Sequence, residues 1–86
     1  MYLHLGQSTV IRTDSVIGIF DLDNSTVMKS TRDYLNKAQK DGVVVNVSDE
    51  LPKSFTVTCD KKNGRRVYIA QPAVPTLIKR LAKKDI

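Results

Sequence analysis

The sequence has few of the residues that metal binding and catalysis use most often. Its 86 residues include one cysteine, Cys59, and one histidine, His4, so the chain cannot form an intramolecular disulfide. One histidine and one cysteine far apart in the sequence do not make a zinc site. The four glycines are scattered, which excludes a glycine-rich phosphate-binding loop. We therefore expect no metal and no cofactor.

The chain also lacks long hydrophobic segments. No apolar run approaches the roughly 18–20 residues of a membrane span, and residues 1–6 lack the basic region of a signal peptide. We expect a cytoplasmic protein with a reduced thiol. Eighty-six residues suffice for a single domain, 1–86, that buries only about 60–65% of the surface exposed by its unfolded chain. Oligomerisation is the expected additional source of stability.

Positive charge is concentrated in the second half of the chain. The net charge is +5, but residues 1–52 carry five basic and seven acidic residues, whereas residues 53–86 carry nine basic and two acidic ones. A basic half suggests a polyanionic partner. The simpler alternative is a lysine-rich surface that only contacts solvent.

The apolar run 16–20 ends at Asp21 and Asp23 and resembles the nucleophile motif of aspartate-based phosphohydrolases. That chemistry also needs a second acidic cluster for Mg²⁺, which residues 53–86, with only Asp60 and Asp85, do not provide. The aspartates therefore indicate a strand end and a helix cap.

Cys59 falls inside an alternating strand pattern, so we expect it to be buried and inert. His4, between two leucines, is expected to be structural and to point away from them. We expect a protein that is not an enzyme.

The remaining pattern predicts an α+β fold with one mixed sheet. Candidate strands cover residues 2–5, 9–13, 16–21, 43–47, 55–59 and 65–70. A central helix is predicted from the apolar face formed by Val27, Thr31, Tyr34, Leu35 and Ala38, with candidate caps at Asp23, Asn24 and Ser25 and a stop at Gly42. The valine run 43–47 is typical of a strand buried on both faces. Strand 16–21, the helix and the run 43–47 follow one another as in a β-α-β unit. The same succession of elements is equally compatible with an α+β sheet. A terminal helix is predicted from the face Val74, Leu77, Ile78 and Leu81.

A basic β-hairpin is predicted near the middle of the basic half. Residues 60–64 contain the Asn-Gly turn signal, and four cations surround the turn: Lys61, Lys62, Arg65 and Arg66. Lysine and arginine side chains bind phosphate oxygens, and a two-stranded ribbon fits a groove of duplex DNA. Aromatic residues do not alternate with these cations, apart from Tyr68, so stacking on single strands is less supported.

Five segments resemble the small bacterial extracellular matrix regulatory proteins of the RemA/RemB family, and most of all its RemB branch. They are YLHLG at 2–6, IGIFDLD at 17–23, NV at 46–47, LPKSF at 51–55 and AQP at 70–72. The resemblance implies a non-enzymatic transcription regulator of biofilm-matrix genes. It also implies a closed ring that presents arginines to DNA in a repeated array.

The chain departs from the RemA pattern at the residues that this resemblance assigns to DNA. The RemA branch has an arginine just before the strand equivalent to residues 16–21, where this chain has Ser15 with Arg12 close by. An arginine pair in the loop equivalent to residues 48–54 is replaced here by one cation, Lys53. We therefore predict a nucleoid-associated, ring-forming protein that binds double-stranded DNA mainly through Lys61, Lys62, Arg65 and Arg66, with Arg12 and Lys53 as secondary contacts. The alternatives are a ring-forming module that acts on a related regulator without binding DNA, and an RNA-binding domain.

Overall fold

The computed structural model of the chain describes residues 2–6, 9–22, 29–48 and 50–82. Its elements are β1 (Tyr2–Gly6), β2 (Thr9–Arg12), the 3-10 turn η1 (Thr13–Ser15), β3 (Val16–Asp21), α2 (Lys29–Lys40), β4 (Val44–Asn46), β5 (Ser54–Asp60), β6 (Gly64–Ala70) and α3 (Val74–Ala82). The predicted α+β class is confirmed. The candidate caps Asp23, Asn24 and Ser25, and Val27 of the helix face, lie outside the described residues. Neither described helix is long and apolar enough to span a membrane.

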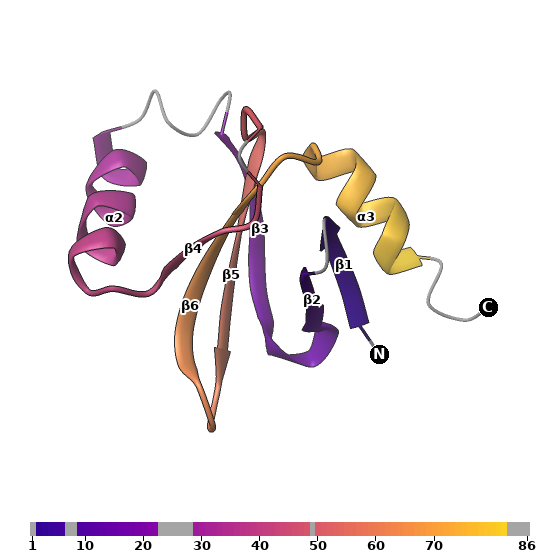
Figure 1. Cartoon of the computed structure of the whole chain (residues 1–86), viewed down its shortest axis with the longest axis horizontal. Helices are drawn as coiled ribbons and strands as arrows, with labels where there is room; N and C mark the ends of the chain where they lie inside the picture. The colour runs from indigo at the N-terminus through magenta and orange to yellow at the C-terminus, as the bar shows by residue number, and fades with distance from the viewer. Residues whose placement is uncertain (1, 7–8, 23–28, 49, 83–86) are drawn as a thin grey trace.

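The strands form two sheets rather than one. β1 and β2 make a separate antiparallel pair, and the other four strands form a sheet in the order β3-β5-β6-β4 (Figure 1). β5 is antiparallel to both of its neighbours, whereas β4 is parallel to β6. β3 and β4 therefore run in the same direction, as a β-α-β unit requires, but β5 and β6 lie between them.

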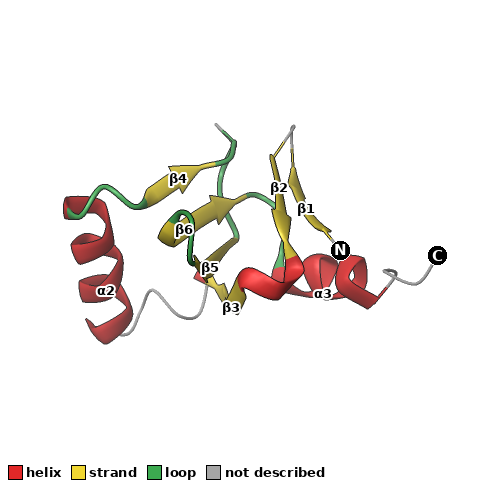
Figure 2. Ribbon diagram, turned by 90° about the horizontal axis from the view of Figure 1, so that it is seen from below, coloured by secondary structure: helices red, strands yellow, loops and turns green. Residues whose placement is uncertain are grey.

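The four-stranded sheet is covered on both faces. α2 lies on one side, and the β1–β2 pair with α3 lies on the other (Figures 1 and 2). On the α2 side, Ala38 packs with Phe55, Val57 and Val67. On the opposite side, the buried cluster consists of Leu3, Leu5, Ile11, Val47, Ala70 and Leu77. Each core is small, as expected for a chain of this length.

β5 is more buried than its sequence predicted. The alternation of Phe55, Val57 and Cys59 with Thr56 and Thr58 is typical of a strand with one face in solvent, yet both threonines are buried. The reason is the second layer, because the β1–β2 pair and α3 cover the face that the alternation assigned to water.

Cys59, in contrast, is less buried than predicted, because its side chain is exposed. It follows Phe55 and Val57 on the α2 side of β5, but it lies next to the hairpin turn, which extends beyond the helix (Figure 1). The expectation of a buried thiol was therefore wrong.

The valine run 43–47 does not form a strand buried on both faces. β4 covers Val44–Asn46 only and lies at the edge of the sheet, where Val44 and Val45 are half-buried and Asn46 is exposed. Val47, one residue after the strand, enters the core beside Leu3 and Leu5.

Both helices bury the predicted faces in part. In α2, Ala38 is buried with Tyr34 and Leu35 packed beside it, and the helix ends before Gly42, whose φ of 73° suits a C-terminal glycine. In α3, Leu77 is fully buried, but Ile78 is 53% exposed. The prediction for Ile78 was wrong, because α3 contacts the β1–β2 side along a narrower stripe than the sequence pattern spans.

Candidate nucleic-acid interface

The predicted basic hairpin is present and its turn is well defined. β5 and β6 pair in regular antiparallel register from Ser54–Ala70 to Asp60–Gly64. The Asp60 Oδ1 atom accepts hydrogen bonds from the backbone N–H groups of Lys62, at 2.9 Å, and Asn63, at 2.6 Å. The bond from Asn63 is the largest cause of a lowered pKa at Asp60, and the charge of Arg66 lowers it further. Gly64 adopts a φ of 69°, which returns the chain into β6.

Arg12 lies beside this turn, although about fifty residues separate them in sequence. A hollow of about 530 Å³ opens between the end of β2 with η1 and the tip of the hairpin. Its lining consists of Arg12, Asp14, Ser15, Asp60, Lys61, Lys62 and Asn63. We call this the basic hollow. It unites three of the six predicted DNA-binding residues: Arg12, Lys61 and Lys62.

The charge of Arg12 is partly compensated by a neighbouring carboxylate. Its Nη2 atom lies 2.7 Å from Asp14 Oδ2, and its Nε atom donates to Asp14 Oδ1 at 3.2 Å. This two-point hydrogen bond raises the pKa of Arg12. Both side chains are about two-thirds exposed, so the pair can exchange for other partners at little cost.

Replacing Asp14 by asparagine should strengthen DNA binding several-fold. The substitution releases the Arg12 guanidinium toward phosphate and should make the slope of log affinity against log salt steeper by about 0.9. Fluorescence anisotropy with a short duplex measures both quantities. Asp33→Asn is the matched control, because it removes the same charge from an exposed pair with Lys29 on α2. An equal gain in DNA affinity for Asp14→Asn and Asp33→Asn would show a general charge effect rather than a role of Arg12.

Arg65 and Arg66 lie on opposite faces of the hairpin. Arg65 shares the α2 side with Val67, where its Nη2 atom lies 3.0 Å from Asp41 Oδ2 and its guanidinium carbon lies 5.5 Å from the centre of the Tyr34 ring. Arg66 shares the other side with Tyr68 and donates a hydrogen bond to the Arg65 carbonyl oxygen at 3.0 Å. Adjacent strand residues point to opposite faces, so only Arg66 is on the side of the basic hollow.

Lys53 is far from the other predicted contacts. It precedes β5, whereas Lys61 follows it, so the seven-residue strand separates them by roughly 20 Å. The Lys53 backbone connects Leu22 and Ala70 by hydrogen bonds of 3.0 Å each. Lys53 is exposed, but it does not contribute to the basic hollow.

Sequence reasoning missed the acidic partners of the arginines. The spacing of Arg12 and Asp14 at the end of a strand is a local signal that could have predicted their pair. Nothing in the sequence connects Asp41 with Arg65, because that contact depends on the packing of α2 against the sheet. Within the described ranges, no three His, Cys, Asp or Glu side chains are grouped to hold a metal ion.

No protein-family model matches the chain. Over 80 residues the chain is 35% identical to Extracellular matrix regulatory protein B of Bacillus subtilis (strain 168), and the alignment covers 93% of this chain and 89% of that protein. The chain belongs to the extracellular matrix regulatory protein family. The family resemblance noted in the sequence is confirmed across nearly the whole chain.

In this extracellular matrix regulatory protein, the fold separates the six predicted DNA-binding residues into three places. Arg12, Lys61 and Lys62 line the basic hollow, and Arg66 lies on the same side of the hairpin. Arg65 is held on the α2 side, and Lys53 lies at the far end of β5. The basic hollow is therefore the largest cluster among them.

Proposed function

We propose that this extracellular matrix regulatory protein is a non-enzymatic transcription regulator that binds duplex DNA mainly through phosphates. The observation that carries the proposal is the convergence of Arg12, Lys61 and Lys62 around one hollow at the tip of a projecting β-ribbon. A ribbon of two strands has the width of a DNA groove, and its cations reach phosphates on either side.

The state of the charges in the basic hollow supports a polyanionic ligand. Asp14 is paired with Arg12, and Asp60 Oδ1 accepts two backbone N–H groups of the turn. Among the described residues, no ion pair involves Lys61 or Lys62, and both side chains are exposed. They are free to replace condensed counterions on DNA, which is the main source of affinity for a phosphate-directed protein.

We further propose that copies of the chain form a ring and that its targets are biofilm-matrix genes. The name of the Bacillus subtilis relative connects that protein with the extracellular matrix, and we extend the role to this chain. A ring would repeat the basic hollow around its circumference. Repetition converts a few weak phosphate contacts per chain into high avidity.

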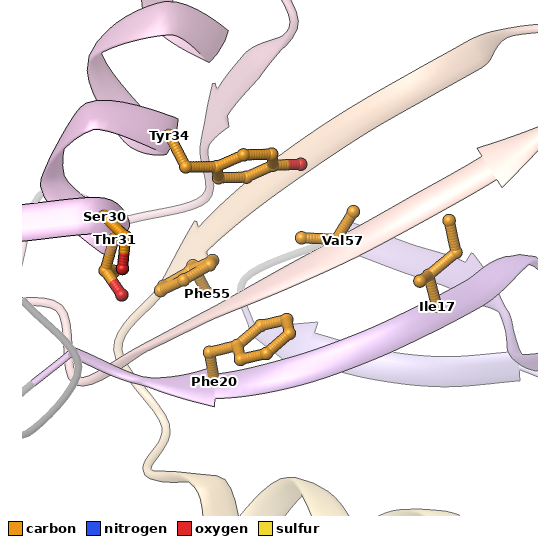
Figure 3. Close-up of a pocket in the computed structure, with 7 residues that line it drawn as sticks. All are labelled: Ile17, Phe20, Ser30, Thr31, Tyr34, Phe55 and Val57. Carbon is orange, nitrogen blue, oxygen red and sulfur yellow. The ribbon is translucent and has the colours of Figure 1, made fainter.

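One observation favours a second candidate, a module that acts on a partner regulator without binding DNA. Arg65 is engaged with Asp41 and Tyr34, and two exposed apolar side chains of β3, Ile17 and Phe20, line a pocket together with Tyr34 (Figure 3). In that case, substitutions at the exposed apolar residues would abolish function, whereas substitutions at the hairpin cations would not.

A salt titration tests the DNA proposal. If Lys61, Lys62 and Arg66 each neutralise one phosphate, the slope of log affinity against log salt is about −2.7 per bound chain, a loss of roughly 40-fold between about 50 and 200 mM salt. Duplexes of unrelated sequence should bind with similar affinity. No binding at low salt would refute the proposal, and stronger binding to single-stranded or structured RNA would favour the RNA-binding alternative.

A further inference from the structure

A smaller hollow of about 160 Å³ adjoins the basic hollow, between β2 and the hairpin. We call it the side hollow. The two hollows share part of their lining: Arg12, Ser15, Asp60 and Asn63. The side hollow is completed by residues that do not line the basic hollow: Val10, Ile11, Thr58 and Tyr68. Because so much of the lining is shared, the two hollows form one continuous depression. The basic hollow alone, at about 530 Å³, has the size of a small-ligand site.

Tyr68 provides the aromatic surface of the side hollow. It lies on β6 two residues after Arg66, so both side chains are on the same face of the strand. The Tyr68 side chain packs against the buried cluster that contains Ile11, and it is only half-buried. Its ring is therefore held in place while part of it lines the hollow. An aromatic ring presented in this way can stack on a nucleobase of any type.

The side hollow also has an apolar wall and polar groups at its junction with the basic hollow. Val10 of β2 is 49% exposed and lines the side hollow together with Tyr68 of β6. Asp60 and Asn63 line both hollows. Carboxylate and amide groups can hydrogen-bond the polar edge of a base. The side hollow thus combines the two kinds of contact that a nucleobase uses.

The charges are concentrated at the other end of the depression. The basic hollow is lined by three cations and two carboxylates, a net charge of +1. Both carboxylates already accept hydrogen bonds, Asp14 from Arg12 and Asp60 from the backbone of the turn. Among the described residues that line the side hollow, the one cation is Arg12, which is shared. A cationic end next to an aromatic end matches the order of phosphate and base in a nucleotide.

We propose that the two joined hollows bind one unpaired nucleotide, with its phosphate beside Arg12, Lys61 and Lys62 and its base against Tyr68 and Val10. This inference rests on the phosphate contacts of the proposed function and adds a contact to the base. A base inside a duplex is stacked and paired, so it reaches such a site only when it is unpaired. The nucleotide is therefore free in solution or belongs to an unpaired part of a strand. A single ring accommodates one base rather than a stack of several.

The contact to the base can be separated from the contact to the phosphate. AMP and ribose 5-phosphate carry the same phosphate and differ in the base, so the ratio of their affinities measures the base contact. AMP should bind at least about fivefold more tightly at low salt. Amide chemical shifts in NMR spectra follow both titrations. AMP should shift the signals of Val10 and Tyr68 as well as those of the turn, whereas ribose 5-phosphate should shift mainly those of the turn.

Three variants assign the two contacts to their residues. Tyr68→Leu should abolish the preference for AMP and leave the affinity for ribose 5-phosphate unchanged. The matched control is Tyr34→Leu, on the α2 side and outside both hollows, which should keep the preference. Lys61→Ala/Lys62→Ala should weaken both ligands by the same factor. Because Tyr68 also packs against the core, Val10→Ser at a half-exposed position is a second variant and should lower the preference for AMP. Circular dichroism verifies that each variant is folded.

Two duplexes distinguish the sources of the nucleotide. One is blunt, and the other carries a single unpaired nucleotide with a terminal phosphate. Tighter binding of the second duplex, lost in Tyr68→Leu, would assign the site to a nucleic-acid strand, whereas a preference for AMP without this gain would assign it to a free nucleotide. Absence of both effects would overturn the inference, as would effects that survive Tyr68→Leu or are lost equally in Tyr34→Leu.

Failure of this inference is distinguishable from failure of the proposed function. Salt-dependent binding of the blunt duplex without any contribution of Tyr68 would overturn the nucleotide site and leave the DNA proposal intact. A preference for AMP that depends on Tyr68, in a protein that does not bind the blunt duplex, would support the site and refute the DNA proposal.

Discussion

Replacing both Lys61 and Lys62 by alanine should lower the affinity for duplex DNA by at least about tenfold at about 50 mM salt. The two ammonium groups project from the turn of the hairpin without ion-pair partners among the described residues, so each can displace a counterion. Removing both should reduce the slope of log affinity against log salt by about 1.8. The loss should be similar for all duplex sequences, because the contacts are to phosphates.

The matched control for this variant removes two exposed lysines elsewhere, Lys29 at the start of α2 and Lys79 on α3. Both double variants have the same net charge, so a general electrostatic effect would weaken DNA binding equally in both. A specific role of the basic hollow requires that Lys29→Ala/Lys79→Ala retain most of the affinity and slope. Equal losses would place the DNA contact elsewhere.

Replacing Leu77 by alanine should unfold a large fraction of the protein. Leu77 is fully buried on α3 and packs in the cluster with Leu3, Leu5 and Ile11. Truncating a buried leucine costs about 2–5 kcal/mol. A chain of 86 residues is expected to have a free energy of unfolding on the order of 4–13 kcal/mol. The substitution thus removes a substantial part of the free energy of unfolding.

The adjacent residue provides the control for Leu77. Ile78→Ala should change the free energy of unfolding by no more than about 0.5 kcal/mol, because the Ile78 side chain is largely in solvent. Urea denaturation followed by circular dichroism compares the two variants at one protein concentration, since self-association shifts apparent stability. Comparable midpoints would mean that α3 is not held by the buried stripe described above.

Local sequence signals were sufficient to predict most of the secondary structure. The Asn63-Gly64 turn between alternating strands predicted the β5–β6 hairpin, and the spacing of Tyr34, Leu35 and Ala38 predicted the buried face of α2. Both signals depend on residues close together in the sequence. The order of the strands could not be obtained in this way, because β3 and β4 each pair with strands far along the chain.

Burial was predicted less well where two layers meet. Thr56 and Thr58 have the polarity of solvent-facing residues but are covered by the second layer, and Cys59 has the polarity of a core residue but lies beyond the helix. In each case the decisive factor is the position and length of another element. Side-chain type alone does not contain that information.

The candidate site was predicted in its parts but not in its geometry. The cations of the hairpin were evident from the sequence, and alternation along β6 could have assigned Arg65 and Arg66 to opposite faces. The position of Arg12 beside Lys61 and Lys62 depends on how the β1–β2 pair packs on the sheet. Residues so far apart in sequence become neighbours only through tertiary structure.

The strand order has a consequence for the folding kinetics. β5 and β6, at the centre of the four-stranded sheet, are joined by a three-residue turn, whereas β3 and β4 reach the sheet across much longer segments. Short loops close faster and at lower entropic cost, so we expect this hairpin to form early and the outer strands to add to it. Substitutions in the turn would then alter the refolding rate more than the unfolding rate. The segment that we propose for DNA contact would also be the folding nucleus, so selection on either property would constrain the other.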